Sequence, residues 1–132
     1  MAEPNPVQVC ALAAMPPFIT ADGSTIRELA GPTPESADSR HQSLAEATVE
    51  PGGQTTEHYH RRAEEIYYFV AGSGRLRLGG EQGAEAAVRA GDCVVIAPGT
   101  LHTLFNDGSE PLVLLCCCSP PYSDDDTVLT GE

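Results

Sequence analysis

Glycine-containing turns divide this chain into short segments, and this division limits the folds that it can adopt. Turn signals such as Asp22-Gly23, Gly72-Ser73-Gly74 and Asn106-Asp107-Gly108 separate apolar runs of strand length. No segment has a long 3.6-residue apolar period, so helix is expected only as a minor component. In Arg75 to Leu78 the leucines alternate with arginines, which is typical of a half-buried antiparallel strand. The pattern predicts an all-β sandwich or barrel.

The length of 132 residues predicts a single domain with one core. We expect residues 1–35 to form an extended arm, 36–119 the barrel and 120–132 an acidic tail that ends as a docked loop with a solvated end. The arm would cover an edge of the barrel or cross to a second subunit, and we expect a homodimer. The expected strands are residues 7–12, 25–29, 42–50, 55–60, 66–71, 75–78, 86–89, 93–97, 102–106 and 112–118.

The charge of the chain narrows its possible partners. The formal net charge of -12 comes from 19 acidic residues against 7 arginines, and the sequence contains no lysine. Nucleic acid and anionic membrane surfaces would be repelled by this field, so neither is an expected partner. A Schiff-base lysine is likewise excluded. We therefore expect a small-molecule substrate.

The termini and cysteines indicate the compartment. The apolar run near the amino terminus follows no basic stretch, so we expect neither a signal peptide nor a membrane segment. Three of the five cysteines are consecutive, at 116–118, and neighbours in a strand point to opposite faces, which does not suit a disulfide framework. We expect a reducing cytoplasm. These cysteines are most simply small apolar fillers of a barrel wall.

A cluster of candidate metal ligands lies in the middle of the chain. His58 and His60 are one residue apart and would share a face of a strand, and Glu65 could join them once the chain has turned back. His-x-His alone is more often two surface or hydrogen-bonded histidines. With His102, however, the set offers three imidazoles and one carboxylate, which suit divalent Mn, Fe, Co, Ni, Cu or Zn. Such a set leaves an open position at the metal for a substrate.

The spacing of these residues resembles the two motifs of the cupin family. The first motif is matched by Gly52-x5-His58-x-His60-x4-Glu65-x6-Gly72. The second is matched by Gly91-Asp92 and by Pro98-Gly99-x2-His102-x3-Asn106, except that Ala97 stands where a proline is usual. The chain therefore resembles a single-domain cupin over roughly residues 42–118.

This resemblance implies a small antiparallel jelly-roll barrel. It also implies that the metal ligands are His58, His60, Glu65 and His102. Glu64 competes with Glu65, because some cupins use a shorter gap after the second histidine. The distance to Gly72 favours Glu65.

The alternation of side chains along a strand extends the list of candidate residues. If Glu65 faces the cavity, Tyr67 and Phe69 do so too, while Ile66, Tyr68 and Val70 face outward. If His102 faces inward, so does Leu104, and Asn106 is a further candidate. Tyr67 is a candidate general acid or base, with a hydrogen-bonded core tyrosine as the alternative. Phe69 and Leu104 are candidate substrate contacts.

Two arginines follow the second histidine of the cluster. Arg61 and Arg62 would lie at the rim, where they could receive an anionic substrate or form solvated pairs with Glu57 or Glu64. A cysteine that reached the cavity could join the metal, as in thiol dioxygenases of this superfamily. Those enzymes usually lack the carboxylate ligand, whereas Glu65 is present here.

The chain is therefore expected to be a metal-dependent enzyme acting on a small molecule. Dioxygenase-type chemistry on a bidentate substrate is expected slightly ahead of non-redox lyase or isomerase chemistry, and the fold is compatible with both. The alternative is a non-catalytic cupin that binds or senses a small molecule. Cupin sensors usually carry a DNA-binding helical domain, and this chain has neither the length nor the basic charge for one.

Overall fold

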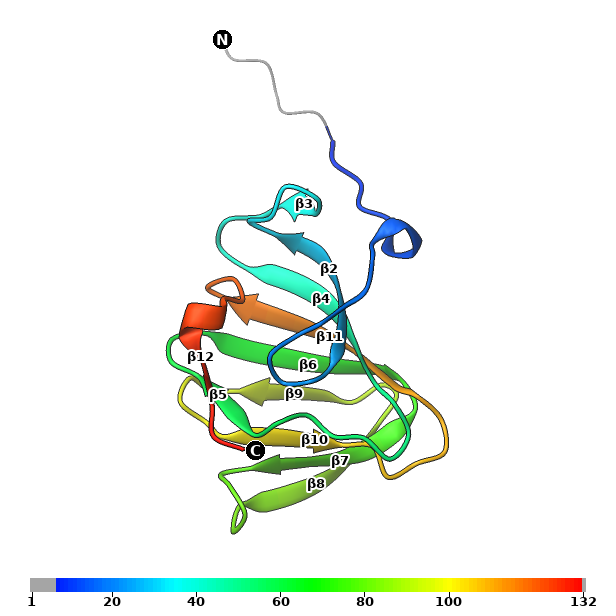
Figure 1. The fold of residues 1–132 in the computed structure, drawn as a ribbon, viewed down its shortest axis with the longest axis vertical. Helices are drawn as coiled ribbons and strands as arrows, with labels where there is room; N and C mark the ends of the chain where they lie inside the picture. Colours follow the sequence, from blue (N-terminus) through cyan, green and yellow to red (C-terminus); the bar gives the residue numbers. More distant parts are fainter. Residues whose placement is uncertain (1–6, 132) are drawn as a thin grey trace.

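The computed structural model describes residues 7–131 as two β-sheets that face each other (Figure 1). The larger sheet has the order β1 (Phe18–Ile19), β2 (Thr25–Gly31), β4 (Ser43–Val49), β11 (Leu112–Ser119), β6 (Glu64–Ala71) and β9 (Cys93–Ile96), with β3 (Ala37–Asp38) beside β2. The smaller sheet has the order β12 (Thr127–Leu129), β5 (His58–His60), β10 (His102–Phe105), β7 (Ser73–Leu78) and β8 (Ala84–Arg89). Two short 3-10 segments, η1 (Leu12–Ala14) and η2 (Asp124–Asp126), complete the described chain. The predicted antiparallel jelly-roll barrel is confirmed.

The core lies between the sheets and is built by alternating residues. Along β6 the inward residues Tyr67 and Phe69 pair with Cys116 and Leu114 of the antiparallel neighbour β11. Phe69 and Leu114 are 0% and 1% exposed, whereas Tyr68, between the inward residues of β6, is 45% exposed. The predicted inward and outward faces of β6 are therefore confirmed, and they place a row of side chains toward the barrel interior.

Two motif glycines are needed by the backbone at the ends of strands. Gly72, between β6 and β7, has φ +83°, and a Cβ atom there would clash with the carbonyl oxygen of Pro111. Gly91, in the turn between β8 and β9, has φ +96°. Residues with a side chain rarely adopt this left-handed conformation, which accounts for glycine at both positions.

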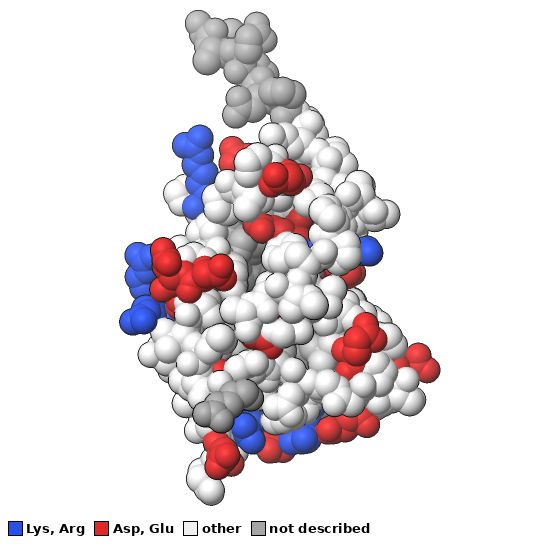
Figure 2. Space-filling view, in the orientation of Figure 1, with Lys and Arg blue, Asp and Glu red and all other residues white. Residues whose placement is uncertain are grey.

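The surface carries charge in many places and some apolar side chains. Acidic side chains lie at several separate places on the face seen in Figure 2, with arginines among them near its rim. On the outer face of the larger sheet, Tyr68, Val70 and Val95 are 45%, 42% and 58% exposed. In the described residues neither short helix has the length or apolar character of a membrane-spanning segment.

The N-terminal arm differs from the expected arrangement. Residues 7–12 form no strand; Val7 and Val9 are 91% and 87% exposed, and no described strand pairs with them. A strand needs a neighbour for its backbone hydrogen bonds, which this run does not have. Instead β1 and β2 form a hairpin, and β2 pairs with β4, so the arm extends one edge of the larger sheet.

The C-terminal segment also differs from expectation. The expected loop contains β12, which pairs with β5 and so completes the smaller sheet. Asp126 is 4% exposed rather than solvated. Its carboxylate accepts hydrogen bonds from the backbone N–H groups of Arg62 and Ala63 at 2.9 and 3.0 Å. Hydrogen bonds to a charged acceptor are among the strongest in proteins, so Asp126 anchors the tail to the loop after β5.

Replacing Asp126 by alanine should destabilise the fold. The Ala63 N–H would lose its acceptor in a buried place, which we expect to lower the free energy of unfolding by about 2–3 kcal/mol. Urea denaturation followed by circular dichroism measures this change. Asp125→Ala is the matched control, because Asp125 is exposed. Equal stability of the two variants would contradict the anchoring role.

Candidate metal centre

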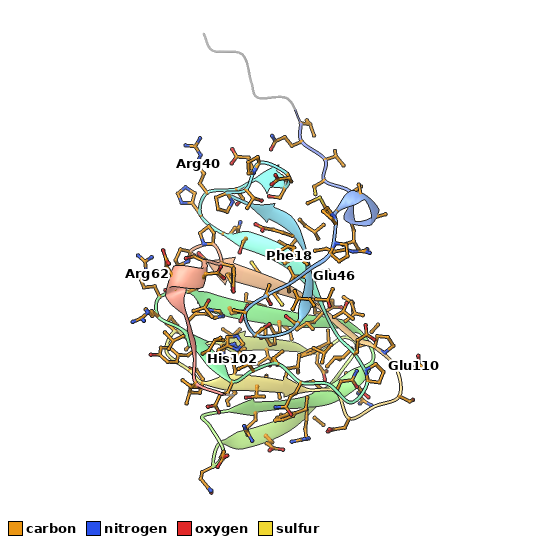
Figure 3. All side chains as sticks on the ribbon, viewed as in Figure 1. Phe18, Arg40, Glu46, Arg62, His102 and Glu110 are labelled. Atoms are coloured by element: carbon orange, nitrogen blue, oxygen red, sulfur yellow. The ribbon has the colours of Figure 1, made fainter. Side chains whose placement is uncertain are left out.

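Three histidines and one glutamate converge between the two sheets. His58 and His60 lie on β5, His102 on β10 and Glu65 on β6, and their ligand atoms all lie within 4.8 Å of one another. All four are buried, with exposures between 1% for His102 and 5% for Glu65. His58 and His102 are register partners across β5 and β10, which places their rings side by side. Figure 3 shows His102 between the two sheets.

The outer nitrogens of two histidines are held by the backbone. Nδ1 of His58 lies 2.7 Å from the carbonyl oxygen of Thr56, and Nδ1 of His102 lies 2.9 Å from that of Thr100. A carbonyl oxygen only accepts, so in both rings Nδ1 carries the hydrogen and donates it. The Nε2 lone pairs are therefore left to face the cluster, as in metal-ligating histidines.

The third histidine is held by the C-terminal strand. Nδ1 of His60 lies 3.1 Å from the hydroxyl of Thr127, and this hydroxyl donates its own hydrogen to the carbonyl oxygen of Ser123. The Thr127 oxygen thus accepts from Nδ1–H of His60. β12 therefore orients a candidate ligand from 67 residues further along the chain.

Glu65 occupies the centre of the cluster. Its Oε1 lies 3.2 Å from Nε2 of His60 and 3.4 Å from Nε2 of His102. Its Oε2 accepts a hydrogen bond from the thiol of Cys118 at 3.1 Å, and Glu65 and Cys118 are register partners on β6 and β11. One carboxylate oxygen is thus directed to the imidazoles while the other is held from behind.

The donor set fits a divalent metal ion. Nε2 of His102 is buried and makes no hydrogen bond, and a buried polar atom without a partner is costly unless something binds it. Three imidazole nitrogens and one carboxylate oxygen are the donors that divalent Mn, Fe, Co, Ni, Cu and Zn accept. His58, His60, Glu65 and His102 therefore form a possible metal-binding site, as the sequence predicts.

Burial and charge set the protonation of the cluster. Burial lowers the pKa of His58, and the neighbouring His102 lowers it further, which favours the neutral ring. For Glu65, burial opposes ionisation, but the imidazoles of His102 and His60 outweigh it and lower the pKa far below its usual range. Burial also lowers the pKa of His60, yet hydrogen bonding and attraction from Glu65 raise it overall. An ionised carboxylate and neutral imidazoles are the forms of these side chains that bind a metal ion.

A cavity of about 70 Å³ adjoins the cluster. On a scale where one water needs roughly 10–15 Å³, it holds several waters or one small molecule. The arm contributes one wall, β4, β11 and β6 a second, and the cluster a third. The residues that line the cavity include Asp22, Glu28, Tyr67, Leu104, Cys116, Cys118 and Tyr122.

The other predicted site residues are divided between the cavity and its surroundings. Tyr67 and Leu104 line the cavity, and the Tyr67 ring lies 6.0 Å from that of His102. Phe69 packs in the core behind Tyr67, at 6.1 Å between ring centroids, and does not line the cavity. Glu64 is exposed, so Glu65 is the carboxylate that faces the cluster.

Arg61 and Arg62 lie outside the cavity. Both are exposed, and Figure 3 shows Arg62 at the outer edge of the molecule. Nε of Arg62 lies 3.6 Å from Asp126 Oδ1, so its acidic partner is neither Glu57 nor Glu64. The structure does not bring either arginine toward the cluster.

Sequence reasoning missed several residues of the cavity wall. Asp22 was assigned only to a turn, and Tyr122 only to the tail, yet both line the cavity. Cys116 and Cys118 line it as well, and the thiol of Cys118 contacts a candidate ligand. The alternation along β11 could have identified the two cysteines once the pairing of β11 with β6 was known, but no local signal marks Asp22.

Comparison with known proteins agrees with this geometry. Residues 45–118 match the family described as "Cupin domain". The chain belongs to the cupin family. Its relatives include the uncharacterized protein MJ1618 of Methanocaldococcus jannaschii, which is 46% identical over 84% of this chain and 85% of its own length.

Solved structures share the fold of this cupin. Pac13 of Streptomyces, a nucleoside dehydratase, superposes with a TM-score of 0.75 at 16% identity, over 96% of this chain and 92% of its own. The oxalate decarboxylase of Lactobacillus farciminis superposes with a TM-score of 0.73 at 23% identity, over 89% of this chain but only 34% of its own. At 16% and 23% sequence identity, these superpositions establish a shared fold.

Removing either of two histidines should remove bound metal from this cupin. His60→Ala and His102→Ala each delete a donor, and we expect affinity for Co²⁺ to fall by more than about 100-fold, since even outer residues of metal sites are worth about 10–100-fold. Elemental analysis after dialysis measures the bound metal. His41→Ala is the control, because His41 is exposed and is not one of the cluster residues. Full metal content in both cluster variants would exclude the site.

The thiol of Cys118 should strengthen metal binding by holding Glu65. Cys118→Ala removes the donor to Glu65 Oε2 and should weaken Co²⁺ affinity by about 10-fold. Cys118→Ser keeps a hydrogen-bond donor, so its Co²⁺ affinity should fall less. Competition with a chelator measures both. Cys117→Ala serves as the control, since Cys117 lies on the opposite face of β11. Identical affinities of Cys118→Ala and the wild type would rule out the thiol's contribution.

Proposed function

We propose that this cupin is a metal-dependent enzyme that catalyses a non-redox reaction of the lyase or isomerase type on a small molecule. The observation that supports it best is the position of the His58, His60, Glu65 and His102 cluster, which adjoins a cavity beside a buried tyrosine. A divalent metal held by these four residues would polarise a substrate oxygen as a Lewis acid.

Tyr67 is the proposed proton donor. It is 3% exposed and lies on the same face of β6 as Glu65. Burial raises the pKa of its hydroxyl well above the ordinary value, and the charge of Glu65 raises it further. The phenol therefore keeps its proton in the free enzyme and can donate a hydrogen bond, or the proton itself, to a substrate oxygen that gains negative charge.

The charge of the cavity wall supports an uncharged substrate. Asp22, Glu28 and Glu65 line the cavity, and among the described lining residues there is no arginine. An anionic substrate would meet two further carboxylates besides the candidate ligand and would find no side-chain cation to pair with. A small neutral molecule with hydroxyl or carbonyl groups fits this wall better.

Two thiols in the wall support non-redox chemistry over dioxygen chemistry. Cys118 contacts Glu65 and Cys116 lines the same cavity. Reactive oxygen species generated beside these thiols would put them at risk of oxidation. The names of two fold neighbours, an oxalate decarboxylase and a nucleoside dehydratase, describe a decarboxylation and a dehydration.

A screen without oxygen tests this proposal. Metal-loaded protein is incubated anaerobically with a mixture of small sugars, hydroxy acids and nucleosides, and products are identified by mass spectrometry. Loss of water or of carbon dioxide, or isomerisation, supports the proposal. Turnover seen only in a parallel incubation in air, with oxygen atoms added to the product, would instead establish the dioxygenase. Tight binding of a compound without turnover would establish the binding module.

Replacing the tyrosine hydroxyl should affect turnover and leave the metal in place. For the substrate found in that screen, Tyr67→Phe should reduce kcat by about 10²–10⁴-fold, the usual contribution of a positioned acid or base. Metal content should not change. Tyr68→Phe is the matched control, since the neighbouring Tyr68 faces solvent. Unchanged kcat in Tyr67→Phe would make Tyr67 a core residue only.

A further inference from the structure

A carboxylate of the N-terminal arm reaches the cluster from the side opposite β6. Asp22 lies in the arm turn, residues 20–24, which joins β1 to β2. Figure 1 shows this part of the arm, in blue, crossing in front of β6 and β11. Oδ2 of Asp22 lies 3.6 Å from Nε2 of His58. No motif of the family contains this residue, which lies outside the matched residues 45–118.

The carboxylate of Asp22 is fixed by one of its oxygens. Oδ1 accepts three hydrogen bonds, from the Thr20 hydroxyl at 2.7 Å, the Ser24 N–H at 2.9 Å and the Ser24 hydroxyl at 2.6 Å. These bonds leave Oδ2 directed at His58. The side chain is therefore held in place on the cavity wall, as a preorganised site residue would be.

The arm turn is anchored to the segment that orients His58. The backbone N–H of Thr56 donates to the carbonyl oxygen of Asp22 at 2.7 Å, and the carbonyl oxygen of the same Thr56 accepts from Nδ1 of His58. One residue thus fixes both the backbone of Asp22 and the ring of His58. Their facing atoms are set in position by the same peptide segment.

The two facing atoms are a nitrogen and an oxygen that can both bind a metal. In the neutral ring, with Nδ1–H donating to Thr56, Nε2 of His58 presents a lone pair to a carboxylate oxygen that is also an acceptor. Two acceptors that face each other at 3.6 Å repel unless a cation lies between them. A metal that bonds nitrogen and oxygen donors at about 2.0–2.2 Å can bind two donors up to about 4.4 Å apart. The separation of Asp22 from His58 lies within that limit, and Asp22 lies at the edge of the cluster, outside the four residues whose ligand atoms are all within 4.8 Å of one another.

We propose that Asp22 is a fifth donor to the metal centre, delivered by the N-terminal arm. This inference rests on the metal site of the proposed function. With Glu65 and Asp22 both bound, two carboxylates offset the two positive charges of the ion. A six-coordinate metal would then have one open position instead of two. Such a centre prefers a neutral ligand that binds through one atom over a dianion that chelates.

Cobalt binding to three proteins tests the proposal. Asp22→Asn keeps an acceptor for Thr20 and Ser24 and replaces Oδ2 by an amide nitrogen, which cannot bind the metal. We expect at least an approximately 10-fold loss of Co²⁺ affinity in chelator competition, together with stronger visible absorption, because Co²⁺ absorbs more strongly as its coordination number falls. Asp92→Asn is the control for lost charge: Asp92 also lies in a turn and holds a backbone N–H, but does not line the cavity.

The outcomes separate this inference from the proposed function. Wild-type protein that binds no Co²⁺ would overturn both the proposed metal-dependent function and the fifth donor. Wild type that binds Co²⁺, with an Asp22→Asn variant that has the same affinity and spectrum, would overturn the fifth donor and leave the four-residue site standing. A crystal structure of the Co²⁺-loaded wild type decides the matter without any variant. An Asp22 oxygen at about 2.0–2.2 Å from cobalt supports the proposal, and an oxygen outside bonding distance overturns it.

Discussion

The site depends on the fixed orientation of three imidazole rings. In each ring Nδ1 donates to an oxygen of the protein, of Thr56, Thr127 or Thr100, so that the three Nε2 atoms converge. If one ring turned over, its hydrogen would point at a neighbouring donor and the cluster would lose a ligand. The barrel provides these oxygens through the loops before β5 and β10 and through β12. Each candidate histidine ligand is therefore oriented by a residue that is not itself a candidate ligand.

The same interior favours the ionised form of one acidic group and the protonated form of two others. Glu65 is ionised despite its burial because imidazoles surround it, whereas burial raises the pKa of the nearby Cys118 thiol and Tyr67 phenol so that both keep their protons. Negative charge is thereby concentrated at the ligand positions, and hydrogen-bond donors remain around it. A metal centre needs this separation, since its ligands must offer lone pairs while its surroundings stabilise them.

The sequence was sufficient for the parts of the site that depend on local spacing. Two histidines one residue apart share a face of β5, and the resemblance to the two cupin motifs adds Glu65 and His102 to them. Alternation then placed Tyr67 and Leu104 on the cavity wall. Contacts between distant segments could not be predicted in this way. The docking of Asp22 beside His58, of Thr127 against His60 and of Asp126 under the loop after β5 depends on how the arm and tail fold back, which no periodicity records.

The arm provides one side of the cavity wall from a stretch of sequence that precedes the ligand cluster. Phe18, Thr20, Asp22, Ser24, Ile26 and Glu28 all line the cavity, and they lie in the arm, before the residues that match the family. The ligand cluster, by contrast, lies entirely within the matched residues. One side of the cavity wall is thus encoded apart from the four-residue cluster. A graft of the β1–β2 hairpin from another barrel of this kind would change that side of the wall, together with the proposed fifth donor Asp22, and leave the His3Glu cluster in place.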